Sequence, residues 1–195
     1  MGLRTRSRKL AIVAHEQWVN ACAISPDGRH VVSAAADGTL KRWPLDFDDA
    51  LWESWLSGKE RLNAELAALL LKPLFFQGHT ASVNCCTFAP DGSYLVSGSS
   101  DHTLRLWSVS TGAPLRALLG HAAPVSGCQA SPDAALIVSV AEDGVLKVWR
   151  AHDGVCLMTV QVDGELSACA WTEGGEGLVA VGAMGAYFFR VITRV

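Results

Sequence analysis

The sequence predicts an all-β fold that is built from four repeated units, and two observations support this prediction. The first is a set of four landmark residues with constant spacing: a histidine is followed by serine, aspartate and tryptophan 18, 22 and 28 residues later. The second is the alternation of short apolar runs with turn sequences such as Pro90-Asp91-Gly92, whose proline and glycine favour tight turns. A constant period is the signature of a repeat architecture, so each unit is expected to contain the same strands and turns.

The landmarks occur in three complete copies. These copies consist of His15, Ser33, Asp37 and Trp43, of His79, Ser97, Asp101 and Trp107, and of His121, Ser139, Asp143 and Trp149. The Gly-His pair near the start of a unit and the tryptophan near its end resemble WD40 repeats. This resemblance covers nearly the whole chain and implies a WD40-type β-propeller segment, in which each blade is a four-stranded antiparallel sheet. It also implies use as a protein-binding platform.

The bulk composition favours a protein with a sizeable core and argues against two classes of partner. Half of the 195 residues are apolar and 18% are charged, so disorder is not expected. The net charge of −3 argues against a nucleic-acid or membrane binder, because both need a basic surface. No apolar run approaches the roughly 18 residues of a membrane span. The length fits one domain or part of a larger one.

Four of the six cysteines occupy one position of the repeat. Cys22, Cys86 and Cys128 lie seven residues after a landmark histidine, and Cys169 has the same place in the fourth unit. One small side chain per blade at one strand position indicates core packing rather than a disulfide or a metal site. Free cysteines favour a reducing compartment, so the cytoplasm is predicted, with the nucleus as the alternative.

The chain begins with a basic stretch, residues 1–9, which lacks periodicity and is expected to be a flexible arm. Leu10–Val13 follows and aligns with Leu74–Gln77, the segment that precedes the next landmark histidine. In WD40 proteins this segment is the outermost strand of the preceding blade. The resemblance therefore implies that Leu10–Val13 belongs to a blade that the nearby sequence does not encode.

The first unit shows the expected strands and turns most clearly. Its strands are predicted at Trp18–Ile24, His30–Ala35 and Thr39–Trp43. Ser25–Gly28 forms the first turn, and Asp37-Gly38 is a strong hairpin signal between the second and third strands. Apolar residues lie on both sides of these strands, which is typical of sheets that are covered on both faces.

The first unit also carries an insertion, because its landmark histidine lies 64 residues before the next one, whereas the following pair is 42 apart. The extra residues fall within about 46–72 and predict a helix from the spacing of their leucines, at Leu62, Leu66, Leu69 and Leu70. By its place in the repeat, this insertion joins the third and fourth strands of blade 1. Two interpretations stay open: a helical cap on the propeller's lower face, or a docking helix whose Trp52 and Trp55 contact a partner.

The propeller segment, residues 10–195, divides into units with approximate bounds 10–73, 74–115, 116–156 and 157–195. The fourth unit keeps the hydrophobic pattern and lacks every landmark. In this degenerate unit Val162, Ala180, Met184 and Arg190 stand where histidine, serine, aspartate and tryptophan are expected. The role of the landmarks therefore cannot be carried over to it.

The recurrence of serine, histidine and aspartate raises the hypothesis of a Ser-His-Asp hydrolase, which the pattern argues against. A catalytic triad needs one activated serine beside an oxyanion hole, and the sequence has no G-x-S-x-G elbow. The tryptophan in every copy favours a structural chain, in which the indole donates to serine, serine to histidine and histidine to aspartate. In WD40 proteins this tetrad is structural. We therefore expect no catalytic residue, no cofactor and no metal.

By resemblance, partners are expected on the face that carries the loops after each landmark histidine and the turns around each landmark aspartate. The candidate partner-binding residues at these positions are Trp18, Asn20, Ser82, Asn84, Ser126, Ser100 and Glu142. Trp18 stands out because aromatic side chains dominate many interfaces. The alternative for Trp18 is a ring that packs between adjacent blades.

These features predict a non-catalytic scaffold or adaptor that binds other proteins or peptides, with neither nucleic acid nor membrane as a partner. The alternative is a sensor or regulatory propeller within a larger signalling protein. Four blades are the smallest number with which propellers close. We therefore expect an open arc that is completed by further blades of a longer parent chain or by a second copy, rather than a closed ring of four.

Overall fold

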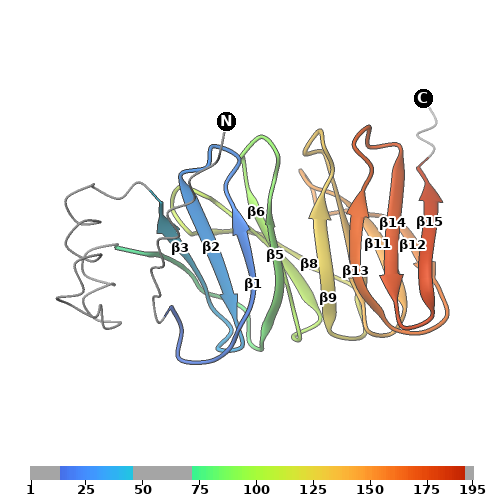
Figure 1. The fold of residues 1–195 in the computed structure, drawn as a ribbon, viewed down its shortest axis with the longest axis horizontal. Coiled ribbons are helices and arrows are strands. Elements are labelled where there is room, and N and C mark those ends of the chain that lie inside the picture. The colour runs from blue at the N-terminus through green and yellow to red at the C-terminus, as the bar shows by residue number, and fades with distance from the viewer. Residues whose placement is uncertain (1–13, 46–71, 192–195) are drawn as a thin grey trace, which may run out of the picture.

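The structure is a computed structural model that describes residues 14–45 and 72–191. This part of the chain is all-β and folds into four antiparallel sheets that follow one another in a row (Figure 1). The all-β prediction is thereby confirmed. The predicted arm 1–9, the predicted strand Leu10–Val13 and all but the last residue of the predicted helical insertion 46–72 lie outside the described residues.

The fifteen strands of the described residues are consecutive within each sheet, and every neighbouring pair is antiparallel. Sheet 1 contains β1 (Val19–Ile24), β2 (His30–Ala35), β3 (Leu40–Pro44) and β4 (Leu74–Phe76). Sheet 2 contains β5 (Val83–Phe88), β6 (Leu95–Ser99), β7 (Thr103–Trp107) and β8 (Pro114–Leu119). Sheet 3 contains β9 (Val125–Ala130), β10 (Leu136–Ala141), β11 (Val145–Arg150) and β12 (Cys156–Gln161). Sheet 4 contains β13 (Leu166–Trp171), β14 (Gly177–Gly182) and β15 (Gly185–Arg190).

The strands of the first unit lie close to their predicted positions. The prediction for β2 agrees with the structure at both ends, while β1 and β3 each begin one residue later than predicted. The strand that precedes His79, β4, pairs with β3, and the strand that precedes His121, β8, pairs with β7. Each of these strands therefore completes the sheet before the landmark histidine, as the resemblance implied.

Sheet 4 differs from the prediction of four strands in every sheet, because its described residues form three. The pairing of β14 with β15 also corrects the predicted alignment of the fourth unit with the other three. In sheet 2 the landmark Trp107 pairs with Leu95, and at the same place in sheet 4 Phe189 pairs with Leu178. Phe189, and not Arg190, therefore takes the position of the tryptophan.

The cause of this shift is a shorter turn. In sheet 1 the amide of Ala35 donates to the carbonyl of Thr39, so that three residues lie between them. In sheet 4 Gly182 pairs directly with Gly185, which leaves two residues in the turn. The turn of sheet 4 is thus one residue shorter and has no position equivalent to that of the landmark aspartate. Met184 therefore does not take the aspartate's place, as the sequence alignment had suggested.

The core lies between successive sheets, because strand side chains point alternately to the two faces and both faces are covered in the middle of the row. One cluster joins sheets 1 and 2 and contains Val32, Leu40 and Trp107. Two further clusters join sheets 2 and 3 and sheets 3 and 4. Every residue of β6 is buried, which confirms that this strand is covered on both sides.

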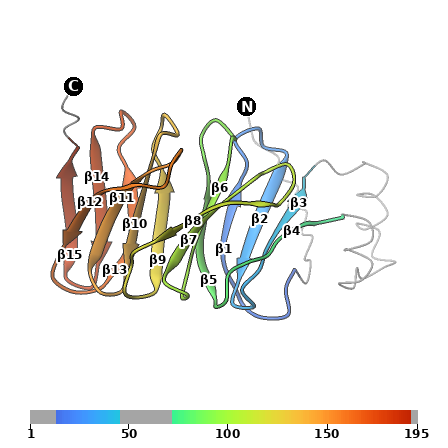
Figure 2. The same cartoon turned by 180° about the vertical axis from the view of Figure 1, so that it is seen from behind.

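The four sheets form an open row. Sheet 1 and sheet 4 lie at opposite ends in two views related by half a turn (Figure 1 and Figure 2). The first strands β1, β5, β9 and β13 contact one another in that order and hold the row together. Within residues 14–45 and 72–191, no helix is long and apolar enough to span a membrane.

Candidate functional site

The landmark residues of sheets 1 and 2 form the predicted chain of hydrogen bonds. In sheet 2 the indole Nε1 of Trp107 donates to Ser97 Oγ over 2.8 Å, and Ser97 Oγ lies 2.8 Å from His79 Nε2. The other ring nitrogen of His79, Nδ1, is 2.8 Å from Asp101 Oδ2. The corresponding distances in sheet 1 are 3.0, 2.7 and 3.0 Å.

A threonine that the sequence interpretation missed fixes the aspartate in both copies. Thr103 donates to Asp101 Oδ1 through its hydroxyl over 2.6 Å and through its amide over 3.0 Å. Thr39 makes the same two bonds to Asp37 in sheet 1, over 2.6 and 2.9 Å. This clamp leaves the second carboxylate oxygen aimed at the histidine.

Burial and hydrogen bonding oppose each other at Asp101. Burial alone would raise the pKa of its carboxyl, because the charged form loses hydration. The hydrogen bonds from Thr103, from His79 and from the amide of Thr80 outweigh that effect and lower the pKa of Asp101 to about 2. Burial lowers the pKa of His79, which the bond to Asp101 only partly offsets.

The third copy corrects the prediction of three complete tetrads. Trp149 and His121 both bond to Ser139 Oγ over 2.8 Å, as in the other copies. However, His121 Nδ1 has no hydrogen-bond partner in the described part of the chain, and the side chain of Asp143 accepts only the amide of Val145. Burial and the nearby charge of Lys147 lower the pKa of His121 to about 4.

The physical reason is the residue two positions after the aspartate. Thr39 and Thr103 supply a hydroxyl that holds the carboxylate, whereas Val145 at the same position has none. Without this bond nothing fixes the second oxygen of Asp143 toward His121. The sequence contained this signal, because threonine occurs 24 residues after the landmark histidine in two copies and valine in the third.

The landmark serines are not exposed groups. Ser97 and Ser139 are fully buried, and Ser33 is nearly so. Each serine oxygen is bonded both to an indole and to an imidazole. Each serine therefore ties the second and third strands of its sheet to the loop before the first strand, and in sheets 1 and 2 the His–Asp bond extends this tie to the turn.

Several candidate partner-binding residues form bonds between neighbouring sheets. Asn20 Nδ2 donates to the carbonyl of Val83 over 3.0 Å, and Asn84 Nδ2 donates to the carbonyl of Val125 over 3.0 Å. Ser126 Oγ donates in the same way to the carbonyl of Leu166 over 2.5 Å. These three side chains lie at one repeat position and connect successive sheets.

The other candidates lie around the same edge of the row. Ser82 Oγ accepts a bond from Asn20, and Ser100 Oγ accepts one from Asn84. Glu142 is exposed. Trp18 is 86% exposed, so its ring does not pack between two of the described sheets.

His102 is a second feature of this edge that the sequence interpretation missed. It follows Asp101 in the turn between β6 and β7 and has a φ of 68°. Glycine occupies the same turn position in sheets 1 and 3, as Gly38 and Gly144. An exposed histidine therefore takes a left-handed conformation that glycine adopts at much lower cost.

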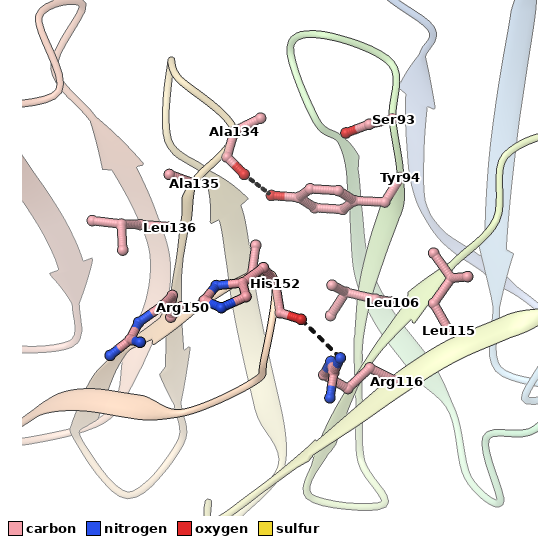
Figure 3. A pocket seen from close by; sticks show the side chains of 11 residues that line it. Ser93, Tyr94, Leu106, Leu115, Arg116, Ala134, Ala135, Leu136, Arg150 and His152 are labelled. Carbon is pink, nitrogen blue, oxygen red and sulfur yellow. Dashed lines mark hydrogen bonds between the residues drawn. The ribbon is translucent and has the colours of Figure 1, made fainter.

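A pocket of about 690 Å³ lies between sheets 2 and 3, at the end of the sheets opposite the landmark aspartates (Figure 3). Its walls include the apolar side chains of Leu106, Leu115 and Leu136. Figure 3 shows Arg116 reaching across from sheet 2 to the carbonyl of His152, over 2.8 Å. The pocket thus combines apolar walls with the guanidinium group of Arg116, which donates to the carbonyls of His152 and Asp153.

The cysteines correct one detail of the sequence interpretation. Cys86, Cys128 and Cys169 are partly covered, whereas Cys22 at the same repeat position is exposed. A contact between different repeat positions was not foreseen, since Cys85 Sγ lies 3.3 Å from Cys128 Sγ. In the described residues, no group of histidine, cysteine, aspartate or glutamate side chains has the arrangement of a metal site.

Comparison with known proteins agrees with this architecture. The family model described as WD domain, G-beta repeat matches residues 7–44, 72–108 and 112–150, which together make up more than half of the chain. Each matched stretch contains one complete set of landmark residues.

Individual relatives match about half of the chain. The ribosome biogenesis protein WDR12 homolog of Drosophila yakuba is 33% identical over 96 residues, or 49% of this chain and 21% of that protein. The small ribosomal subunit protein RACK1 of Saccharomyces cerevisiae is 34% identical over 99 residues, or 50% and 26%. Protein HIR1 of Eremothecium gossypii is 33% identical over 94 residues, or 46% and 10%. The matches thus span at most about a quarter of these relatives' length.

Proposed function

The chain belongs to the WD40 repeat family, and from this premise we propose that it is a non-catalytic scaffold that binds other proteins or peptides. The comparison with RACK1 and the WDR12 homolog supports the coarser statement that it is a WD40 propeller segment. The finer statement concerns what its surface does. Neither nucleic acid nor membrane is a partner in this proposal, in line with the net charge of −3.

The observation that carries the proposal is how the serine, histidine and aspartate side chains are used. A nucleophilic serine must reach a substrate, whereas Ser97 and Ser139 are fully buried and bonded to an indole and an imidazole. The reactive groups are therefore occupied within the sheets, and contact with a partner is the chemistry left to the surface.

Trp18 is the strongest candidate for such a contact. Its side chain is 86% exposed, and a tryptophan that becomes buried at an interface contributes large apolar area and one N–H donor. It lies on the face where the resemblance implies partner binding. Asn20, Asn84 and Ser126 support the shape of this face through their bonds between sheets.

The experiment compares partner capture by the unchanged protein, by Trp18→Ala and by Leu119→Ala. Leu119 is a matched control, because it is also an exposed apolar residue and lies on the outer strand of sheet 2. We expect Trp18→Ala to lose binding proteins that Leu119→Ala retains, with circular dichroism and melting unchanged. Equal capture by all three proteins, or labelling of the unchanged protein by a serine-directed activity probe, would contradict the proposal.

The pocket of Figure 3 offers a second contact with more defined chemistry. Arg116 and Arg150 line it and, among the described residues, no acidic residue does, so it fits a peptide with an apolar side chain beside a carboxylate. Asp153 neutralises part of this charge, since its Oδ2 lies 3.1 Å from Arg150. Leu115→Asp adds a negative charge to the wall and is expected to weaken capture of such a peptide, whereas Leu119→Asp is not.

The second candidate function is that of a sensor or regulatory propeller within a larger signalling protein. The fact that the matches span at most about a quarter of the relatives' length keeps this alternative open. It is distinguished by linking the chain to a signalling domain and measuring whether Trp18→Ala changes that domain's activity. The cytoplasm, with the nucleus as the alternative, is the compartment that both functions share in this proposal.

A further inference from the structure

The two ends of the row are apolar faces with the residue pattern of the internal junctions. The leading face, on sheet 1, consists of Val19, Cys22 and Ile24. The trailing face, on sheet 4, consists of Ala168, Val181 and Phe188. The equivalent residues of the middle sheets are buried or partly buried where one sheet packs against the next.

The residues of the leading face are apolar like their equivalents in the other sheets, but they are exposed. Val19 and Ile24 are 50% and 66% exposed. Their equivalents in sheet 2 are Val83 and Phe88, which are buried in the cluster between sheets 1 and 2. Sheet 1 therefore exposes the face that packs on the preceding sheet in sheets 2, 3 and 4.

The trailing face shows the reciprocal pattern. Phe188 and Val181 are 78% and 39% exposed. Their equivalents in sheet 3, Val148 and Val140, are buried in the cluster between sheets 3 and 4. Phe188 has this position because it pairs with Val179 as Val148 pairs with Val138.

The internal junctions show which positions meet. Between sheets 2 and 3, Cys85 Sγ contacts Cys128 Sγ at 3.3 Å, and Asn84 donates to the carbonyl of Val125 over 3.0 Å. A Cβ atom on Gly98 would lie 2.5 Å from Val125 Cγ1, so these two positions face each other and this junction has room only for glycine there. At the junction of sheets 3 and 4 the same two positions carry Val140 and Leu166, which share one buried cluster.

Applied to the ends of the row, the same register pairs the trailing face with the leading face. Ala168 takes the place of Cys85 and would face Cys22. Val181 takes the place of Val140, which shares a buried cluster with Leu166 of the next sheet, and would face Val19. Ser167 takes the place of Asn84, and its hydroxyl would donate to the carbonyl of Val19. Both side-chain pairs are uncharged, Ala168 with Cys22 and Val181 with Val19.

We propose that the trailing face of one copy packs on the leading face of a second copy, so that two copies form a ring of eight sheets with two identical junctions. Each copy carries one face of each kind, so a head-to-tail pair covers all four faces in the register of the internal junctions. Eight sheets lie within the four to eight that propellers use. Closure also removes the open end that would otherwise continue into a filament.

A disulfide tests the register of the junction. In the variant Ala168→Cys, the new thiol is expected to lie opposite Cys22 of the second copy, as Cys85 lies opposite Cys128. Oxidation with diamide should then yield a covalent product of twice the chain mass of 20.7 kDa on non-reducing gels. The double variant Ala168→Cys, Cys22→Ser and the surface control Leu119→Cys should not yield it.

Solution mass tests the pairing without a cross-link. Light scattering of the unchanged protein at several concentrations should give a mass of twice 20.7 kDa, and Ile24→Glu and Phe188→Glu should each give the mass of one chain. A mixture of these two variants keeps one intact junction and should recover pairs that neither variant forms alone. Such recovery excludes a pair in which two like faces meet.

Three results would overturn the proposal. One is a soluble unchanged protein with the mass of a single chain at all concentrations. Another is a ladder of disulfide products longer than two chains, which would show open head-to-tail association. The third is cross-linking of Ala168→Cys that persists after Cys22→Ser. Partner capture by Trp18 is measured separately, so its failure would not imply failure of the pairing.

Discussion

At the scale of single residues, the hydroxyl two positions after each landmark aspartate decides whether the hydrogen-bond chain is complete. Thr39 and Thr103 hold Asp37 and Asp101 in place through bonds of 2.6 Å. Val145 cannot do this, so Asp143 is left out of the third chain, and His121 Nδ1 is buried with no partner among residues 14–45 and 72–191. A buried polar atom without a partner typically costs about 1–3 kcal/mol, so the third chain is the weakest.

The two aspartates are therefore expected to differ on mutation. Asp101→Ala removes the acceptor of His79 and should lower the free energy of unfolding by about 1–3 kcal/mol. Asp143→Ala removes no bond to a histidine, so its effect should be clearly smaller. Urea denaturation of both variants measures the difference, and equal losses would show that the His79–Asp101 bond contributes nothing.

The reverse change gives the matched control. Val145→Thr supplies the missing hydroxyl and is expected to orient Asp143 toward His121, which should increase stability. Adding Asp143→Ala to Val145→Thr should then cost more than Asp143→Ala alone. A double-mutant cycle isolates this coupling, and additive effects would argue against the clamp.

The lowered pKa of His121 predicts that the stability of the protein depends on pH. The pKa of His121 is lowered to about 4 when the protein is folded, whereas an unfolded histidine titrates near 6.5. Between these values the unfolded chain binds a proton that the folded protein does not. Because protonation then favours the unfolded state, the free energy of unfolding should fall as the pH decreases from about 6.5 to about 4.

His121→Gln should flatten this part of the curve. Asp101 acts at lower pH, because the pKa of its carboxyl is lowered from 3.8 to about 2 in the folded protein. Its contribution to the free energy of unfolding is lost as the pH falls between these two values, where the unfolded chain takes up the proton first. Chemical denaturation at half-unit pH steps distinguishes the two. An unchanged slope in His121→Gln would refute the assignment to His121.

At the scale of strands and turns, the Asp-Gly turn is the element that varies most between the sheets. Gly38 and Gly144 have φ values of 81° and 77° at the position where His102 has 68°. Sheet 4 shortens the turn to two residues between Gly182 and Gly185. Its strands pair regularly in spite of this change, which shows that the hairpin does not depend on the landmark aspartate.

The left-handed conformation of His102 predicts a stabilising substitution. His102→Gly relieves the contact of Cβ with the following carbonyl and should raise the free energy of unfolding by about 1 kcal/mol. Gly38→Ala is the reciprocal change and should lower it by a similar amount. Thermal melting of both variants checks the signs. If His102→Gly also weakens partner capture, the strained histidine contributes to the binding face.

At the scale of the whole molecule, stability is distributed unevenly along the row. Sheet 2 has a complete hydrogen-bond chain, four strands and a neighbour on each side, while the described residues of sheet 4 have none of the landmarks and form three strands. Local opening should therefore require less free energy in sheet 4 than in sheet 2.

Hydrogen exchange tests this contrast on two equivalent strands. Amides of β14 are expected to exchange faster than those of β6, whose residues are all buried. Both strands are central in their hairpins, so the comparison does not depend on edge effects. Equal protection of the two strands would indicate that the whole row unfolds as one cooperative unit.

The sequence by itself determined the elements that depend on local chemistry. The position of β2 followed from the turns on either side of it, and the bonds among Trp107, Ser97 and His79 followed from a constant spacing and from the donors and acceptors of three side chains. The family resemblance added that β4 and β8 belong to the sheet before them. These features repeat from unit to unit, so one copy explains the others.

Tertiary structure alone decided what depends on distant neighbours. The shift from Arg190 to Phe189 comes from the pairing of two strands. The contact of Cys85 with Cys128 joins different repeat positions of two sheets. Burial at the ends of the row belongs to the same class: Val19 and Val83 are the same residue type at the same repeat position, and only the sheet packed against Val83 makes it core.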